Sequence, residues 1–205
     1  MHREYGAKRL WRADLDPDPV LQFHKWFEEG SPTVLEPNAM AFATADAQGR
    51  PSLRMVLMKE FDDHGIVFAT SELSRKGREM AANPRGAVLF YWPELERQVR
   101  ATGAMEHTGS EESDDIFNHR SRASRIAARV SHQSAPIGSR EELDKAFEAE
   151  AARLGDKVPP RPETWHGYRL VPEEFEFWQG GANRLHDRLL YAKGPDGWQI
   201  VRLQP

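Results

Sequence analysis

The residues best suited to chemistry stand near the C-terminus, after a short aromatic segment and a pair of glycines. Residues 175–178 are followed by the two glycines and then, at alternate positions, by Arg184, His186 and Arg188. In an extended chain, side chains two residues apart share a face, so two guanidinium groups and an imidazole line one side. Such groups repel one another unless an anion or an electron-rich ring lies among them. Because paired glycines let the backbone approach a ligand closely, the pattern favours a binding site over a solvated edge strand with salt bridges.

A second cationic group stands at the predicted start of a short helix. Ser74, Arg75 and Lys76 lie where free backbone N–H groups and the positive end of the helix dipole favour an anion. Arg makes bidentate contacts to oxygen anions, and Lys contributes a point charge. Two cations at a helix N-terminus oppose the dipole, which is a small cost that a bound phosphate offsets. The segment predicts either a phosphate site or an exposed basic turn.

Two further pairs of polar residues are weaker indications of a binding site. Arg54 and Lys59 stand five residues apart, so in a regular strand they face opposite sides and do not hold one group unless a bulge intervenes. Arg120 and Ser124 stand four residues apart and could share a helix face that binds a second phosphate. The alternatives are charged strand ends that reach solvent and a solvated helix face.

Amide and hydroxyl side chains at Gln98, Gln133 and Ser134 could bond the carbonyl and N–H edges of a heterocycle, or serve the fold alone. The sequence has no zinc-type His or Cys spacing, no Walker loop, no Gly-x-Ser-x-Gly elbow and no dinucleotide glycine fingerprint. No metal is therefore predicted. His186 has no obvious nucleophile partner in the sequence.

The composition describes an ordinary globular protein. The 205 residues are 39% hydrophobic and 29% charged, with a formal net charge of −4, which argues against a nucleic-acid partner. The absence of cysteine excludes disulfides and thiolate chemistry and is consistent with a reducing compartment. No apolar run is long enough for a signal peptide or a membrane span, so we expect a cytoplasmic protein without a membrane partner.

The elements that must position these residues are mostly strands. We expect a mobile N-terminal arm over residues 1–16 and a single domain over 17–205. Helices are predicted at 18–30, 74–83 and 139–155, with a mixed helical region at 110–129. Strands are predicted at 39–45, 52–61, 66–70, 86–91, 98–106, 165–170, 175–178, 188–192 and 198–203. Because the helices are inserted rather than alternating with strands, the pattern predicts a mainly β (α+β) antiparallel barrel, not a doubly wound sheet.

Together the motifs closely resemble the pyridoxine (pyridoxamine) 5′-phosphate oxidase family. The C-terminal signature of that family, Glu-x-Trp followed after five residues by Arg-hydrophobic-His-Asp-Arg, stands here as residues 176–178 and 184–188. Residues 54–59, 74–76, 96–99 and 131–134 resemble further family motifs in the same order, and the similarity runs from residue 3 to residue 205. The resemblance implies an antiparallel split β-barrel with peripheral helices, assembled as a homodimer with FMN at the subunit interface.

The resemblance also implies the activity and the site. The expected enzyme oxidises pyridoxamine and pyridoxine 5′-phosphate to pyridoxal 5′-phosphate, with dioxygen as acceptor and hydrogen peroxide as by-product. The implied FMN contacts are Arg54, Met55, Val56, Leu57, Met58, Lys59, Ala69, Thr70, Arg75, Lys76, Gln98, Gln133, Ser134, Trp178 and Arg188. The implied substrate contacts are Arg3, Tyr5, Lys59, Arg120, Ser124, Arg184, Leu185 and His186, with Arg184 and His186 as the catalytic pair.

One position departs from the family pattern. Ile116 stands where the family often has a Tyr that helps to bind the substrate phosphate, and Ile cannot donate a hydrogen bond. Loss of one such contact to a charged group weakens binding by about 1.5–3 kcal/mol. Ile116 supports one alternative, a related flavin oxidase of another aromatic substrate, as in phenazine biosynthesis. A second alternative, independent of Ile116, is a non-catalytic carrier of flavin or pyridoxal phosphate.

Overall fold

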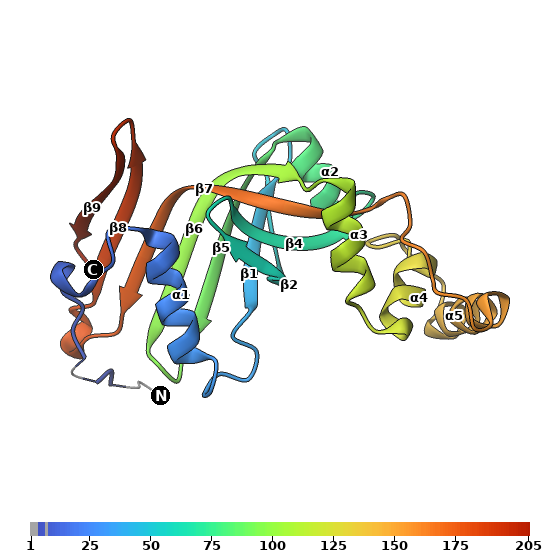
Figure 1. Cartoon of the computed structure of the whole chain (residues 1–205), viewed down its shortest axis with the longest axis horizontal. Coiled ribbons are helices and arrows are strands. Elements are labelled where there is room, and N and C mark those ends of the chain that lie inside the picture. The colour runs from blue at the N-terminus through green and yellow to red at the C-terminus, as the bar shows by residue number, and fades with distance from the viewer. Residues whose placement is uncertain (1–3, 7) are drawn as a thin grey trace.

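The computed structural model describes residues 4–6 and 8–205 (Figure 1). Within them, one curled antiparallel sheet of nine strands carries the fold, in the order β2-β1-β5-β6-β7-β4-β3, with β8 pairing β7 and β9 pairing β8. The strands are β1 (Ala39–Ala45), β2 (Pro51–Leu57), β3 (Glu60–Asp62), β4 (Gly65–Ser71), β5 (Arg85–Trp92), β6 (Arg97–His107), β7 (Trp165–Gln179), β8 (Asp187–Gly194) and β9 (Gly197–Leu203). The predicted antiparallel sheet with inserted helices is confirmed.

The helices lie around this sheet and have identifiable starts. They are α1 (Pro19–Gly30), α2 (Arg75–Ala82), α3 (Ser110–Asn118), α4 (Arg122–Val130) and α5 (Arg140–Leu154), with short 3-10 turns at Arg12–Asp14 and Ala182–Arg184. The side chains of Asp18, Ser74, Ser121 and Ser139 cap α1, α2, α4 and α5 by accepting a backbone N–H bond of the first turn. None of the described helices is long and apolar enough to cross a membrane.

An aromatic core fills the concave side of the sheet. Phe23 and Trp26 of α1 are almost fully buried, and their rings pack against Phe90 and Phe177 of the sheet. A smaller cluster of buried residues lies under α3, where Val67, Ile116, Phe117 and Trp165 meet. The residues that β1 and β6 contribute to the larger cluster alternate with less buried positions, as the period of two requires.

Two strand predictions were wrong in detail. The strand predicted at 52–61 is divided into β2 and β3, because the chain turns at Met58 and Lys59: the Met58 N–H bonds the Asn38 carbonyl and the Lys59 N–H bonds the Val67 carbonyl. The two strands predicted at 165–170 and 175–178 are instead one long strand, β7, which crosses the register shift between Thr102 and Gly103 of β6. β7 therefore pairs with β6 along its length, with β4 near its start and with β8 near its end (Figure 1).

The described part of the N-terminal segment has specific contacts with the C-terminal strands. The Leu10 N–H donates to Asp187 Oδ2 at 2.9 Å, and Arg202 Nη2 donates to the Leu10 carbonyl at 2.7 Å. The Tyr191 hydroxyl donates to the Asp16 carbonyl at 2.7 Å. The predicted mobility of residues 1–16 and the single-domain boundary stay predictions.

Candidate functional site

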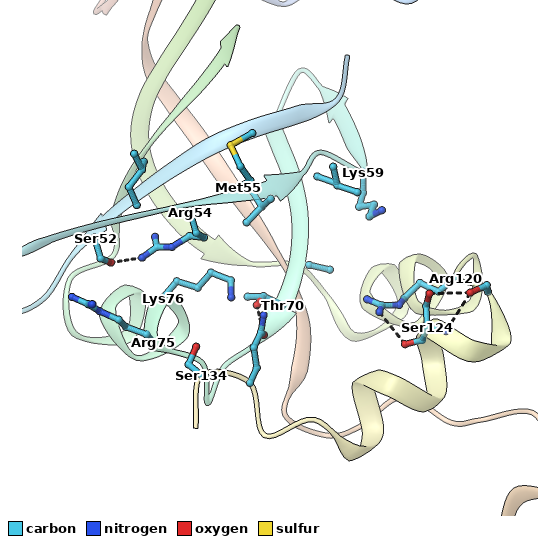
Figure 2. A pocket seen from close by; sticks show the side chains of 16 residues that line it. Ser52, Arg54, Met55, Lys59, Thr70, Arg75, Lys76, Arg120, Ser124 and Ser134 are labelled. Atoms are coloured by element: carbon cyan, nitrogen blue, oxygen red, sulfur yellow. Dashed lines mark hydrogen bonds between the residues drawn. The ribbon is translucent and has the colours of Figure 1, made fainter. Parts of the chain in front are cut away.

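Most of the predicted site residues line one open cavity of about 820 Å³. The cavity lies between the edge strand β2, strand β4, the start of α2 and the loops before and after α4 (Figure 2). Its lining residues are Ser52, Leu53, Arg54, Met55, Val56, Leu57, Lys59, Ala69, Thr70, Arg75, Lys76, Arg120, Ser121, Ser124, Gln133 and Ser134. Arg54 and Lys59 share the cavity although strand parity separates them, because β2 ends at Leu57 and the chain turns before Lys59.

Arg54 is fixed from behind by the neighbouring strand. Its Nη1 donates to the Phe42 carbonyl at 3.0 Å and to Thr44 Oγ1 at 2.7 Å, and its Nη2 donates to Ser52 Oγ. Thr44 and Ser52 are register partners on β1 and β2, which brings both hydroxyls beside one guanidinium. Burial lowers the pKa of Arg54, while Glu79 opposes that shift; a guanidinium stays protonated all the same. The result is a permanent, oriented positive charge at the cavity wall.

A buried carboxylate organises this wall. Glu79 of α2 is 5% exposed, and its Oε2 accepts from Thr44 Oγ1 and Ser52 Oγ at 2.5 Å each. Its Oε1 accepts from Arg75 Nε at 2.9 Å. Burial alone would raise the pKa of Glu79, but the bonds from Ser52, Thr44 and Arg75 outweigh it and lower the pKa to about 2. Glu79 is therefore ionised at any working pH and holds two cavity arginines.

Lys76 contributes a cation that is poorly compensated. It is 6% exposed, and its Nζ donates to Ser74 Oγ at 3.1 Å. Among the described residues, no carboxylate lies within ion-pair distance of this ammonium group. Burial, and then the charge of Arg54, lower the pKa of Lys76 to about 8. A bound phosphate would supply the missing negative charge, so the residues fit the phosphate of FMN.

Arg120 and Ser124 form a second polar wall on the other side of the cavity (Figure 2). Arg120 Nη2 donates to the Ser124 carbonyl at 2.9 Å, and its guanidinium carbon lies 5.2 Å from the centre of the Trp165 ring. The buried Nε of Arg120 has no hydrogen-bond partner among the described residues. Burial lowers the pKa of Arg120. An anion that enters here would satisfy an otherwise unmatched donor.

Gln133 and Thr70 close the base of the cavity. The Thr70 hydroxyl donates to Gln133 Oε1 at 2.9 Å, and the Ser71 N–H reaches the same oxygen at 3.3 Å. Because the oxygen end of the amide is engaged by β4, the amide N–H2 is the end that can donate to a ligand. Ser134, next in the chain, has a left-handed backbone with φ of 71°.

The remaining predicted residues form a second group, the C-terminal cluster, defined here as Gln98, Trp178, Arg184, His186 and Arg188. Gln98, Trp178 and Arg188 are register partners across β6, β7 and β8 and therefore lie side by side. The His186 ring lies 4.7 Å from the Trp178 ring, centre to centre. This cluster presents aromatic rings and hydrogen-bond donors side by side.

Tyr5 and the backbone of Gly181 complete the surroundings of His186. The Tyr5 ring meets the rings of Trp178 and His186 edge-on, at 5.6 and 5.4 Å. The Gly181 N–H donates to His186 Nδ1 at 3.2 Å, so the neutral ring carries its proton on Nε2. Burial, and then the charge of Arg184, lower the pKa of His186. The imidazole is therefore neutral near pH 7. Arg3, also predicted here, lies outside the described residues.

Arg188 is held by the Glu of the signature. Glu176 is buried, and its two oxygens accept from Nε and Nη2 of Arg188 at 2.7 and 3.0 Å. Arg100 Nη2 donates to the same carboxylate at 2.5 Å. The bond to Glu176 raises the pKa of Arg188. Arg188 Nη1 also donates to the Gln204 carbonyl at 3.0 Å, which fixes the guanidinium plane.

The expected extended exit from the glycine pair was wrong at Arg184. Ala182–Arg184 forms a 3-10 turn, and Asn183 and Arg184 have left-handed backbones with φ of 56° and 61°. A Cβ at residue 181 would lie 2.3 Å from the Leu185 carbonyl oxygen, so this close turn requires Gly181. The strand resumes only at Asp187. Arg184, His186 and Arg188 are consequently neighbours without sharing the single face of a strand.

Within one chain, the cavity and the C-terminal cluster are separate. No residue of the cluster lines the cavity, and the two groups lie toward opposite ends of the sheet (Figure 1). Met58, Leu185 and Tyr5 also lie outside the cavity, Met58 being buried in the core. The described structure thus brings together the predicted phosphate contacts, but not these contacts with the predicted ring contacts.

The residues that hold Arg54 in place were not predicted from the sequence. Glu79, Thr44 and Ser52 support Arg54, and Ser121 lines the cavity beside Ser124. A Glu four residues after Arg75 is a sequence signal for an ion pair on a helix. The pairing of Thr44 with Ser52 depends on strand register, which had no comparable signal.

The curled sheet and its cationic cavity define an FMN-binding split-barrel protein. This fold is shared with a pyridoxamine 5′-phosphate oxidase-related, FMN-binding protein from Nostoc punctiforme, at a TM-score of 0.75 and 16% identity over 92% of this chain and 98% of that one. Residues 28–154 match the family model described as pyridoxamine 5′-phosphate oxidase. Residues 165–205 match the model described as pyridoxine 5′-phosphate oxidase C-terminal dimerisation region.

Proteins with higher sequence identity to this chain narrow the assignment from the fold to a family. The chain is 53% identical, over its full length and 95% of the relative, to a pyridoxine/pyridoxamine 5′-phosphate oxidase of Rubrobacter xylanophilus. It is 52% identical, over its full length and 97% of the relative, to one of Burkholderia pseudomallei. PhzG from Burkholderia lata, solved with tetrahydrophenazine-1-carboxylic acid, has a TM-score of 0.91 at 34% identity, over 97% of this chain and 99% of that one.

The chain therefore belongs to the pyridoxine/pyridoxamine 5′-phosphate oxidase family. The predictions of family, split-barrel fold, oxidase activity and FMN as cofactor are confirmed at this level. The matched dimerisation region supports a homodimer.

Proposed function

We propose that the oxidase site forms between two protomers, with the cavity from one chain and the C-terminal cluster from its partner. The observation that carries this proposal is the separation of the two groups within one chain. FMN and a phosphorylated pyridine both need a phosphate site next to a ring site: the cavity supplies the phosphate sites and one side of the ring site, and the cluster supplies the other side. A two-fold dimer brings each cavity to the other chain's cluster and creates two equivalent sites.

The surface around the cavity supports a partner here. Leu53, Met55 and Leu57 of the edge strand β2 are 69%, 64% and 40% exposed, and all three line the cavity rim. An exposed apolar edge strand is a surface that proteins usually cover. A second copy of the chain, placed against β2, would bury this surface and close the open side of the cavity.

The cofactor roles follow from the charges of each group. Arg54, Arg75 and Lys76 bind the FMN phosphate, and the backbone and side chains of residues 55–59, Ala69, Thr70, Gln133 and Ser134 line the ring and ribityl chain. Gln98, Trp178 and Arg188 of the partner complete the ring site. Arg188, rigidly held by Glu176, stabilises negative charge at the flavin ring.

The substrate roles divide in the same way. Lys59, Arg120 and Ser124 hold the substrate phosphate, while the partner's Arg184 covers the pyridine ring and orients its 4′ carbon. The neutral His186 donates from Nε2 to the polar edge of the substrate. Leu185 meets the pyridine ring together with its two neighbours, and the segment of Arg3 and Tyr5 resembles a family segment that can cover the site. When bound, FMN would supply the acceptor for the hydride that leaves the 4′ carbon, and dioxygen, reduced to hydrogen peroxide, would take up the two electrons with two protons. The imine left by the amine substrate would be hydrolysed by water to the aldehyde and ammonia.

A peroxide-release assay on FMN-loaded protein tests this function. We expect peroxide with pyridoxamine and pyridoxine 5′-phosphate, and little with pyridoxine, which lacks the phosphate. Turnover of a non-phosphorylated aromatic acid alone would favour the phenazine-type alternative. FMN binding without peroxide from any of these substrates would favour a carrier. The expected cytoplasmic location stays a prediction.

Mixing two inactive variants tests the shared site. Arg184→Ala disables the cluster, and Arg75→Ala with Lys76→Ala disables the cavity. After unfolding and refolding together, a mixed dimer contains one site with both groups intact and one site with neither. We expect activity to return to about a quarter of the unmodified level, because half of the dimers are mixed and half of their sites are intact. Sites built within one chain would give no recovery.

A further inference from the structure

Ile116 leaves the substrate phosphate without a donor from α3. Its side chain is 5% exposed and packs in the small core cluster with Val67, Phe117 and Trp165. It does not line the cavity. A carbon side chain in this position gives neither a hydrogen bond nor a charge, so a phosphate held by Arg120 and Ser124 must be oriented by other groups.

Ser121 lies on the cavity wall next to these two residues and is bonded twice to Ser124. Its Oγ accepts the Ser124 N–H at 3.2 Å, as the N-cap of α4. Its hydroxyl also donates to Ser124 Oγ at 2.9 Å. Both serines line the cavity. One side chain therefore fixes both the backbone and the hydroxyl of its neighbour.

This pair of bonds decides where the Ser124 proton points. A serine hydroxyl carries one proton and two acceptor positions. Because Ser124 Oγ already accepts from Ser121, its own proton points away from Ser121 and is available to another acceptor. Arg120 Nη2 holds the Ser124 carbonyl at 2.9 Å, which keeps the guanidinium beside that hydroxyl. Both donors are thus presented before a ligand arrives, and less rotational freedom is lost on binding.

We propose that Ser121 is a positioning residue for the substrate phosphate, acting through Ser124 in place of the donor that Ile116 cannot supply. This inference rests on the proposed function, because it takes the wall of Arg120 and Ser124 as the substrate phosphate site. It adds a residue to that site and explains how the chain handles phosphorylated substrates with Ile at position 116.

Ser121→Gly tests the proposal with little cost to α4, since Gly is tolerated at a helix N-cap. The measurements are the Kd of pyridoxal 5′-phosphate for FMN-loaded protein, by calorimetry, and KM and kcat for pyridoxamine 5′-phosphate. We expect Kd and KM to rise about five- to tenfold, the effect of about one hydrogen bond, with kcat within twofold. Binding of pyridoxal, which has no phosphate, should not change.

Two further variants separate positioning from capping. Ser139→Gly removes the equivalent cap of α5, whose Oγ accepts the Glu142 N–H at 3.2 Å, and should leave Kd and KM unchanged. Ser121→Thr keeps both the acceptor and the donor, and should restore Kd and KM to within twofold.

A double-mutant cycle shows whether Ser121 acts through Ser124. In a Ser124→Ala background, Ser121→Gly should add less than twofold to Kd, because the hydroxyl that it orients is gone. Equal Kd values for Ser121→Gly and the unmodified protein, a full effect in the Ser124→Ala background, or no binding of pyridoxal 5′-phosphate at all would each overturn the inference. If the unmodified protein releases no peroxide but the Kd pattern holds, the proposed oxidation fails and the role of Ser121 stands.

Discussion

The cavity and the C-terminal cluster are built on the same ion-pair arrangement and differ in what they add to it. In each, a buried glutamate holds two arginines: Glu79 fixes Arg54 and Arg75, and Glu176 fixes Arg188 and Arg100. The cavity then adds the buried Lys76, whereas the cluster adds the aromatic rings of Trp178 and Tyr5. A buried ammonium group without a carboxylate partner suits a phosphate, and a surface lined with aromatic rings suits a flat heterocycle. The difference indicates a division of labour between anchoring and orientation.

Removing the two cations at the start of α2 should have the largest effect. Arg75→Ala with Lys76→Ala deletes two charge-assisted contacts, each about 1.5–3 kcal/mol, so we expect FMN to bind about 1,000-fold more weakly. Flavin fluorescence titration of apoprotein measures the Kd. Arg78→Ala, an exposed cation on the same helix, is the matched control. Unchanged FMN affinity would contradict the phosphate role of this wall.

Disabling orientation should lower turnover and leave the flavin in place. Arg184→Ala removes the group that positions the 4′ carbon, and we expect kcat/KM to fall about 100-fold, a typical cost of lost alignment. The protein should remain yellow, with the flavin absorbance per protomer unchanged. A colourless protein would show that Arg184 is needed to bind FMN, and would contradict the division between a cavity that anchors and a cluster that orients.

Between pH 7 and pH 9, where the FMN phosphate is already a dianion, the pH dependence of FMN binding should come from Lys76. Its pKa of about 8 in the empty cavity lies below the ordinary value of 10.5 because of burial, and a bound phosphate raises it again. FMN affinity is therefore full below pH 8 and should fall about tenfold between pH 7 and pH 9, as the ammonium loses its proton. Glu79, with a pKa of about 2, does not titrate in this range. Fluorescence titrations from pH 6 to 9.5 measure the slope, and Lys76→Ala should abolish it.

The smallest effect is expected from a substitution of Glu176, the carboxylate that holds Arg188 of the C-terminal cluster. Glu176→Gln keeps the shape but removes the charge that holds Arg188 against Arg100, so both guanidinium groups gain freedom. We expect FMN to bind about three- to fivefold more weakly and kcat to fall by a similar factor. Glu174→Gln, exposed on the same strand and bonded to Thr102 at 3.3 Å, should change neither value. An equal effect of both substitutions would show that FMN binding depends on the total charge of β7 and not on the bonds between Glu176 and Arg188.

Local chemistry made much of the fold predictable. Asp18 followed by Pro19 predicted the start of α1, and Ser74 and Ser139 predicted the starts of α2 and α5. These starts were predictable because a capping side chain and the fixed φ angle of proline act over only a few residues. The division of the strand at Met58 was not predictable in this way. It depends on Asn38 and Val67, which are distant in sequence and bond that turn.

The site was predictable as a set of residues but not as an arrangement. Arg54, Lys76 and Arg120, which the motifs named, line one cavity. Strand parity failed for Lys59 because it assumed a regular strand beyond Leu57. The left-handed turn at Asn183 and Arg184 was hidden because neither residue is glycine. The pairing of Thr44 with Ser52, whose hydroxyls meet Arg54 and Glu79, was hidden because strand register sets it.

The contacts between the two chain ends have a consequence for how the protein is made. Leu10 and Asp16 are bonded to Asp187, Arg202 and Tyr191, which lie 177, 192 and 175 residues away. Contacts of such sequence separation form late, because the chain between them must first be closed into a large loop. During synthesis, residues 10–16 have no docking surface until β8 and β9 have left the ribosome. The segment that carries Tyr5 to its ring contacts should therefore be the last part of the protomer to acquire protection from hydrogen exchange, in a phase slower than the closure of β1 to β6.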